Sequence, residues 1–233
     1  GRLSSGGPYF IVTRTLGQSP GVALGLLFFI GTAFGCAVFI IGAAEALQTA
    51  VGLEDAFPGD TQVISAGLAI LVTCIVGSGI QNVNRAATVA LVGMIMGLSS
   101  VVIGVVVLAC GGKPGYGSES LTEESKDIGG AWWSNYGEDY SFPVLLAILY
   151  PSVTGILSGT NRSGLLQDPS SSIPRGSVRA LATVACVYMT FVWLLGVVVR
   201  REDMRQDKFV MAALAWPHPG VMYVGAIMSA LGA

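Results

Sequence analysis

The chain has 233 residues, of which 52% are hydrophobic and only 11% are charged. Ordinary soluble domains carry roughly 25% charged residues, and a formal net charge of −2 offers no basic surface for nucleic acid. The composition therefore excludes a typical soluble domain and a nucleic-acid-binding protein, and it predicts an integral membrane protein.

Six apolar runs follow one another along the chain, and each is typical of a membrane-spanning helix. They cover about residues 21–47, 61–81, 87–111, 141–161, 180–199 and 211–233. About 18 consecutive apolar residues are enough for a helix to cross a bilayer. A short turn around Asn82–Arg85 is predicted between the second and third runs, and the acidic segment 113–140 follows the third. Because the sixth run reaches the last residue, we expect residues 1–233 to be a fragment of a longer membrane domain.

Two proline-containing segments mark the predicted ends of helices. Asp168-Pro169 is typical of a helix start, because proline is well tolerated at the first helical position. His218, the only histidine, lies between Pro217 and Pro219 and is predicted to be a loop residue at a membrane edge. No enzymatic motif accompanies it, so we expect neither an enzyme nor a cofactor.

The four cysteines lie in apolar runs without the spacing of a metal site, and they are predicted to be small buried residues. They are Cys36, Cys74, Cys110 and Cys186. Glu45, near the end of the first run, is the only carboxylate close to membrane depth. A functional role is one interpretation of such a residue, and a solvated glutamate at the interface is favoured.

The fourth run contains residues that interrupt helices, in Tyr150-Pro-Ser-Val-Thr-Gly-Ile-Leu-Ser-Gly159. Pro151 lacks a backbone donor and clashes with the carbonyl one turn earlier, and glycine weakens a helix further. Two half-helices flanking an unwound segment are one interpretation, and broken helices of this kind hold the substrate in many secondary transporters. A proline-kinked helix with small residues for close packing is the other.

The polar groups of this segment are all neutral. Backbone carbonyls near Tyr150 and Pro151 and the Thr154 hydroxyl suit an alkali cation, whereas amides from Gly155 onward suit an anion. Without a fixed charge in the run, a cation and an anion together would be cheaper to hold than a lone ion. The segment thus fits cotransport of a cation with an anion, and a zwitterionic amino acid fits almost as well.

The charged residues indicate on which side of the membrane the N-terminus lies. With a cytoplasmic N-terminus, six of the 12 Lys and Arg residues would lie on each side, so the positive-inside rule does not decide. The acidic segment 113–140 favours an external position for itself and hence an internal N-terminus.

The residues from Tyr150 to Gly164, followed by Asp168 and Ser172-Ile-Pro-Arg-Gly176, closely resemble the cation–chloride cotransporters, especially the potassium–chloride branch. Support comes from residues 9–17 and 31–42. The resemblance implies the amino acid–polyamine–organocation superfamily and an all-α, inverted-repeat (LeuT-like) fold. In that fold the six runs would be helices three to eight of twelve, with the fourth run broken.

The resemblance also implies two sets of ion ligands. By matching positions, the cation set is Tyr150, Pro151 and Thr154, and the chloride set is the backbone amides of Gly155, Ile156 and Leu157. Phe39 stands where the family usually has a tyrosine whose hydroxyl helps to bind potassium. Gly232-Ala233 fall where sodium-dependent members place two serines, so no sodium site is expected.

The implied function is electroneutral cotransport of potassium with chloride by a secondary active transporter. An amino-acid permease of the same superfamily is the first alternative, and a non-transporting membrane subunit is the second, because Phe39 removes an expected ligand. The expected partners are potassium, chloride and the lipid bilayer, with no metal beyond the alkali cation. We further expect a multi-pass protein of the plasma membrane that forms a homodimer.

Overall fold

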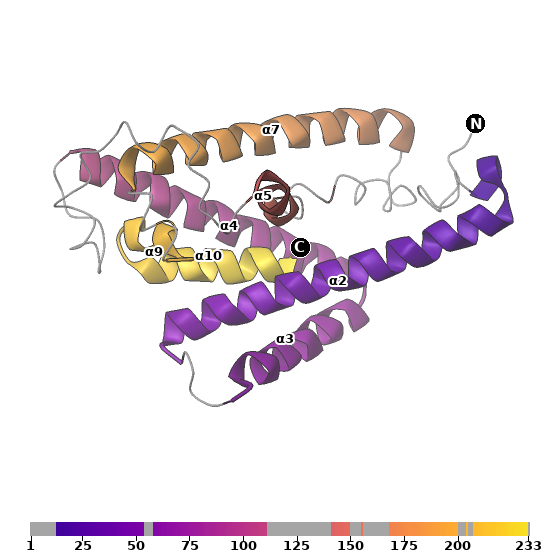
Figure 1. Ribbon diagram of the computed structural model, residues 1–233, viewed down its shortest axis with the longest axis horizontal. Coiled ribbons are helices and arrows are strands. Elements are labelled where there is room, and N and C mark those ends of the chain that lie inside the picture. The colour runs from indigo at the N-terminus through magenta and orange to yellow at the C-terminus, as the bar shows by residue number, and fades with distance from the viewer. Residues whose placement is uncertain are drawn as a thin grey trace. The chain divides into compact units, whose positions relative to one another are not determined.

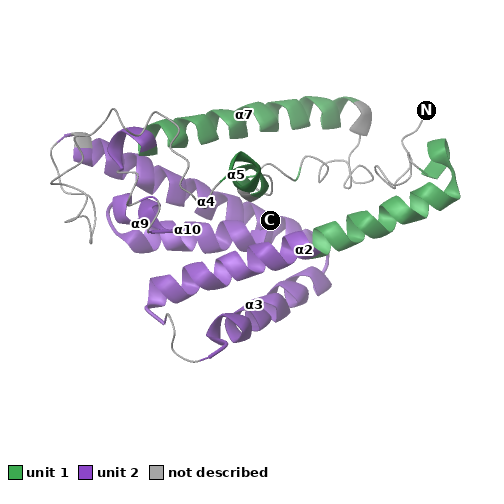
Figure 2. Ribbon diagram, viewed as in Figure 1, with its two compact units in different colours: residues 1–33, 133–195 green, residues 34–132, 196–233 purple. Residues whose placement is uncertain are grey.

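The structure is a computed structural model, and all regular elements in the part of the chain that it describes are helices (Figure 1). It describes residues 13–53, 58–110, 141–149, 155, 168–199, 204 and 207–232. The helices are α2 (Gln18–Val51), α3 (Asp60–Gly77), α4 (Ile80–Ala109), α5 (Phe142–Leu149), α7 (Pro169–Val198), α9 (Val210–Leu214) and α10 (Pro219–Gly232). The chain divides into two compact units (Figure 2). One unit comprises residues 1–33 and 133–195, and the other comprises residues 34–132 and 196–233.

Four of these helices are long and apolar enough to cross a membrane, namely α2, α3, α4 and α7. They correspond to the first, second, third and fifth predicted runs, so the predicted all-α membrane class is confirmed. In α2 and α7 no residue of the most apolar stretch is buried within the chain itself. Such apolar surface is what helices present to lipid or to other membrane helices.

The same exposure corrects the prediction made for the cysteines. All four are free thiols, and all four are exposed on the surface of the chain rather than buried. An apolar sequence environment therefore did not imply burial within this chain.

The turn between α3 and α4 lies at Ser78–Gly79, so the predicted turn at Asn82–Arg85 is wrong. The Ser78 hydroxyl donates to the Ile75 carbonyl at 2.6 Å and closes the end of α3. Gly79 has φ of 106°, a conformation that glycine adopts readily and other residues avoid. The polar residues that suggested a turn instead lie in the first turns of α4, and Asn82 donates its side-chain amide to the Ser78 hydroxyl at 3.1 Å.

Helix α7 confirms the start predicted at Asp168-Pro169, but it is much longer than the run 180–199. The Asp168 carboxylate accepts a hydrogen bond from the Ser171 hydroxyl at 2.8 Å, and the Asp168 carbonyl accepts one from the Ser172 amide at 3.2 Å. Pro174 lies inside the helix and removes one backbone hydrogen bond. The polar residues 169–179 therefore form the first three turns of the same helix as the apolar run.

The sixth run is not one helix, which corrects the prediction of a single run over 211–233. Helix α9 ends at Leu214, Ala215 is extended with ψ of 130°, and α10 begins at Pro219. Two prolines explain the division, because the residue before a proline is pushed out of the helical region. The residues between the helices, Ala215 to His218, are called the link below, and His218 lies in it as a loop residue, as predicted.

Helices α4 and α10 pack through small residues that bring their backbones together. On α4 the contacting residues are Ala90, Gly93, Gly97 and Gly104, and facing them are Gly232, Met228, Gly225 and the Leu214 carbonyl of α9, respectively. This seam of small residues runs antiparallel along the two helices. The largest fully buried side chains, Val101 and Leu214, lie beside it. Close approach at small residues is how helices associate where no hydrophobic effect between them is available.

Candidate ion-binding region

The fourth run is described up to Leu149, before its predicted break, and at Gly155. Helix α5 covers Phe142–Leu149, and the next described residue is Gly155. Of the predicted ligands, Tyr150, Pro151, Thr154, Ile156 and Leu157 lie outside the described residues.

Gly155 is exposed and has φ of 115°. A right-handed helix requires φ near −63°, so the run is not helical at Gly155. A Cβ added there would meet no atom within 4 Å. The conformation, rather than lack of space, therefore explains why glycine suits this position, and it favours the broken helix over the kinked one.

Phe39 lies in α2 and is 38% exposed. Its ring supplies no oxygen for a cation. Gly35 and Gly42 lie one turn away on either side, on the same face of the helix, and a Cβ on either would meet no atom within 4 Å. The helix surface one turn before and one turn after Phe39 is therefore not covered closely by another segment of the described chain. Phe39 and Gly155 belong to different compact units, and each is described separately.

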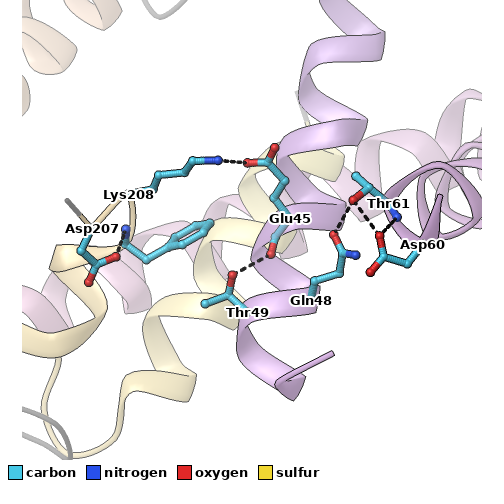
Figure 3. A network of polar contacts seen from close by, with 8 residues as sticks. Glu45, Gln48, Thr49, Asp60, Thr61, Asp207 and Lys208 are labelled. Atoms are coloured by element: carbon cyan, nitrogen blue, oxygen red, sulfur yellow. Dashed lines mark hydrogen bonds and ion pairs between the residues drawn. The ribbon is translucent and has the colours of Figure 1, made fainter. Parts of the chain in front are cut away.

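Glu45, at the end of α2 that precedes α3, takes part in the polar contacts of Figure 3. Lys208 Nζ lies 3.5 Å from Glu45 Oε2, and the two side chains are 77% and 41% exposed, respectively. The Thr49 hydroxyl donates to the Glu45 carbonyl at 3.1 Å. A half-exposed glutamate with a lysine partner supports the interfacial interpretation, and an exposed pair of this kind contributes about 0–1 kcal/mol.

A second set of contacts joins α2 to α3 in the same view (Figure 3). The Thr61 hydroxyl donates to the buried Gln48 side-chain oxygen at 3.0 Å. The Thr61 amide donates to Asp60 Oδ1 at 2.6 Å, and an acidic residue in the first turn is favourable for the dipole of α3. Sequence reasoning missed this connection. The available signal was Gln48, a polar residue followed by threonine at the end of an apolar run.

A third feature, also missed from the sequence, is the anchoring of the link to α4. The Ser100 hydroxyl donates to the Trp216 carbonyl at 2.8 Å, and the Trp216 amide donates to the Ser100 carbonyl at 3.2 Å. Non-helical backbone near a membrane needs such partners, because an unsatisfied polar group in an apolar environment is costly. Ser100 is buried, and the pair Ser99-Ser100 within an apolar stretch of α4 was the sequence signal for it.

Comparison with known proteins shows which family the chain belongs to. A family model described as amino acid permease matches residues 2–231. The chain belongs to the amino acid permease family. Among its relatives, "Cation-chloride cotransporter 1" of Arabidopsis thaliana is 33% identical, and the protein of that name in Oryza sativa subsp. japonica is 31% identical. "Solute carrier family 12 member 9" of Homo sapiens is 30% identical.

Each of these three matches covers 100% of this permease-family chain but only 27%, 27% and 29% of the respective relative. The chain thus spans a little over a quarter of their length. The resemblance to cation–chloride cotransporters seen in the sequence is confirmed across the whole chain. Together with the four helices of the described residues that are long and apolar enough to cross a membrane, the family identifies an integral, multi-pass membrane protein. Within the described residues, no group of three or more His, Cys, Asp or Glu side chains could hold a metal ion.

Proposed function

We propose that the full-length protein is a secondary active transporter that couples a cation to chloride, and that the cation is potassium. The observation that carries the proposal is the interruption of the fourth run at Gly155. An interrupted membrane helix exposes carbonyls at the end of one half and amides at the start of the other, and these bind ions of opposite sign. The name "Cation-chloride cotransporter 1", which two of the relatives carry, supports the same function.

In this proposal the carbonyls of Tyr150 and Pro151 and the hydroxyl of Thr154 bind the cation. The amides of Gly155, Ile156 and Leu157 bind chloride. Transport is electroneutral because the run has no fixed charge to balance a single ion. Each ion then lowers the cost of removing the other from water.

Isotope influx with the full-length protein tests the coupling. Rubidium, as a potassium substitute, and chloride are each measured with and without the other ion. Each flux should require the other ion. Rubidium and chloride fluxes that are independent of each other would refute cotransport.

The position of the cation is tested by Thr154→Val, which keeps the shape of the side chain and removes its oxygen. The change should abolish cation-dependent chloride uptake at matched surface expression. Thr73→Val is the matched control, because within the described residues the Thr73 hydroxyl bonds the Ala69 carbonyl of its own helix, at 2.7 Å. Normal transport by Thr154→Val would mean that the cation binds elsewhere.

Phe39→Tyr tests whether the missing hydroxyl limits cation binding. One added oxygen ligand contributes on the order of 1 kcal/mol, or up to about tenfold in apparent potassium affinity. Phe39 is 38% exposed, so its ring is not fully enclosed by the chain. Unchanged or weaker potassium affinity would remove Phe39 from the proposed cation site.

Sodium should not be required. Ala233 lies outside the described residues, but Gly232 packs so closely against Ala90 that a side chain at position 232 would overlap the Ala90 methyl group. A serine ligand for sodium therefore does not fit at position 232 without movement of α4 or α10. Replacing external sodium by an inert organic cation should leave chloride-coupled uptake unchanged, and a sodium requirement would contradict the potassium–chloride assignment.

Amino-acid transport is the second candidate, and the amino acid permease match over residues 2–231 favours it. It predicts uptake of a labelled amino acid that proceeds without chloride. Absence of amino-acid, rubidium and chloride flux would instead indicate a non-transporting subunit. We also propose a plasma-membrane location and a homodimer, which surface biotinylation and cross-linking of the full-length protein would test.

A further inference from the structure

The start of α7 carries two arginines directly before its apolar stretch. Arg175 and Arg179 are both exposed, and neither forms an ion pair or a hydrogen bond with another described residue. Helix α7 itself contains no acidic residue. The nearest described carboxylate along the chain, that of Asp168, accepts from the Ser171 hydroxyl and lies about 10 Å along the helix axis from Arg175. Two guanidinium charges against one carboxylate leave this part of the helix surface positively charged.

Four residues of α7 form one surface patch, called the arginine patch below, namely Ser172, Arg175, Gly176 and Arg179. They are spaced three or four residues apart, and residues at these spacings are neighbours on one face of a helix. A Cβ added at Gly176 would meet no atom within 4 Å. The patch therefore has a gap at Gly176, and its neighbours on the helix face carry two guanidinium groups and one hydroxyl. Because all four residues lie on a single helix, the patch does not depend on how the two compact units are arranged.

The arginine patch lies at the level of the lipid headgroups when α7 spans a bilayer. The apolar run 180–199 has about the length that a hydrocarbon core of ~30 Å requires. Arg179 directly precedes this run, and Arg175 lies one turn, about 6 Å, farther from the core. Each headgroup layer is roughly 5–8 Å thick, so the two arginines lie near its inner and outer edges. Since Cβ atoms tilt toward the N-terminus of a helix, both side chains lean away from the hydrocarbon.

The chemistry of the patch indicates what it can bind. Guanidinium groups bind phosphate oxygens through paired hydrogen bonds. The arginine nearer the core lies at the depth of the phosphodiester that all phospholipids share. The other arginine lies at the depth of whatever group the headgroup carries beyond its phosphodiester. Two cations placed in this order match a headgroup with a second, outer phosphate, and they disfavour choline, whose outer group is itself a cation.

We propose that the arginine patch binds an anionic phospholipid whose headgroup carries a second phosphate. Arg179 binds the phosphodiester, and Arg175 binds the outer phosphate together with the Ser172 hydroxyl. No residue in the most apolar stretch of α7 is buried within the chain, so the acyl chains can lie along it. With the orientation proposed above, the patch faces the cytoplasmic leaflet, in which anionic lipids are concentrated. Binding holds the start of α7 at the membrane surface.

Native mass spectrometry of the purified full-length protein measures the affinity for lipids directly. Three lipids with the same acyl chains are titrated. They are phosphatidylcholine, phosphatidylglycerol with one anionic group, and a phosphatidylinositol monophosphate with two. The phosphatidylinositol monophosphate should bind most tightly and phosphatidylcholine most weakly. Inorganic phosphate, an anion without acyl chains, should not displace the bound lipid.

Two variants test the two properties of the patch. Arg175→Gln combined with Arg179→Gln removes both charges and should weaken binding of the phosphatidylinositol monophosphate roughly 30-fold, since each basic residue near the surface contributes about fivefold. Gly176→Leu retains both charges, fills the gap and should also weaken binding. Arg85→Gln is the matched control, because Arg85 is an exposed arginine at the start of α4 and no other residue of α4 is charged. This change should leave the affinity nearly unchanged.

The melting temperature without added lipid, measured in parallel, should be close to that of the parent for every variant and shows that each one is folded. Unchanged affinity in the double arginine variant, or an equal loss in Arg85→Gln, would overturn the proposal. Equal affinity of the parent for phosphatidylglycerol and the phosphatidylinositol monophosphate would overturn the second phosphate, and displacement by inorganic phosphate would overturn the lipid. None of these measurements involves transport, so their failure is distinguishable from failure of the proposed function.

Discussion

Replacing Gly225 by alanine provides the most direct test of how α4 and α10 pack. A Cβ at position 225 would lie 2.8 Å from the Gly93 carbonyl oxygen, 2.9 Å from Gly97 Cα and 3.2 Å from the Gly97 amide nitrogen. All three atoms belong to the backbone of α4, so no side chain can rotate to make space. Accommodating the methyl group requires the two helices to move apart.

The expected cost follows from two opposing terms. Overpacking costs about 1–3 kcal/mol, and the upper end applies where the obstructing atoms are backbone. Alanine gains about 1 kcal/mol over glycine in helix propensity. The difference, about 3 less about 1, predicts a loss of about 2 kcal/mol in the free energy of unfolding. At about 2–4 °C per kcal/mol in domains of 150–250 residues, the melting temperature should fall by about 4–8 °C.

Thermal unfolding of the purified full-length protein measures this loss. Gly67→Ala in α3 and Gly35→Ala in α2 are matched controls, because a Cβ at either position meets no atom within 4 Å of the described chain. Both controls should melt at or slightly above the parent temperature. If Gly225→Ala behaves like them, the backbones of α4 and α10 are not in contact and the seam of small residues is misassigned.

Two further predictions follow from the polar contacts, and a third follows from the proposed orientation. Ser100→Ala should lower the free energy of unfolding by about 1 kcal/mol, because it removes the hydrogen bond to the link. Thermal unfolding measures this loss against Ser99→Ala, since in the described part of the chain the Ser99 hydroxyl bonds a carbonyl of its own helix. Equal effects of the two changes would refute the anchoring. Lys208→Gln should change the free energy of unfolding by less than about 1 kcal/mol, because the lysine is 77% exposed, and a larger loss would mean that the ion pair is buried in the full-length protein. In a background without native cysteines, a cysteine that replaces Ser118 should react with an impermeant thiol reagent from outside. A cysteine that replaces the exposed Ser172 should react only from inside. The reverse pattern would overturn the proposed orientation.

The sequence was sufficient to predict the helical membrane class, because four of its apolar stretches form helices that are long and apolar enough to cross a membrane in the described part of the chain. The start of α7 was predictable from Asp168-Pro169, since a local capping signal depends only on neighbouring residues. The turn between α3 and α4 was placed a few residues too late. Polar Asn82 and Arg85 suggested a loop, but the glycine that permits a positive φ, Gly79, decides where the chain turns.

Contacts between distant parts of the chain were beyond sequence reasoning. The division of the sixth run could have been inferred from Pro217 and Pro219, but its anchoring by Ser100 depends on which helix lies beside the link. The connection of Gln48 to Thr61 likewise requires the geometry of two adjacent helices. At the candidate ion site, the prediction of an interrupted helix rests on local chemistry. The identity of the bound ions depends on the arrangement of several segments, and therefore stays a proposal.

The pairing of α4 with α10 has a consequence for how the protein enters the membrane during synthesis. Ser100 and its partner Trp216 are 116 residues apart in the chain. At about 5–20 residues per second, a ribosome needs roughly 6–23 s to synthesise that interval. During this time α10 has not yet been made, and one face of α4, with its four small residues and the Ser100 hydroxyl, lacks its partner helix. The Ser100 hydroxyl can bond a carbonyl of its own helix in the meantime, so the arrival of α10 would involve an exchange of partners. A ribosome that stalls after α4 would leave this face open to other nascent helices.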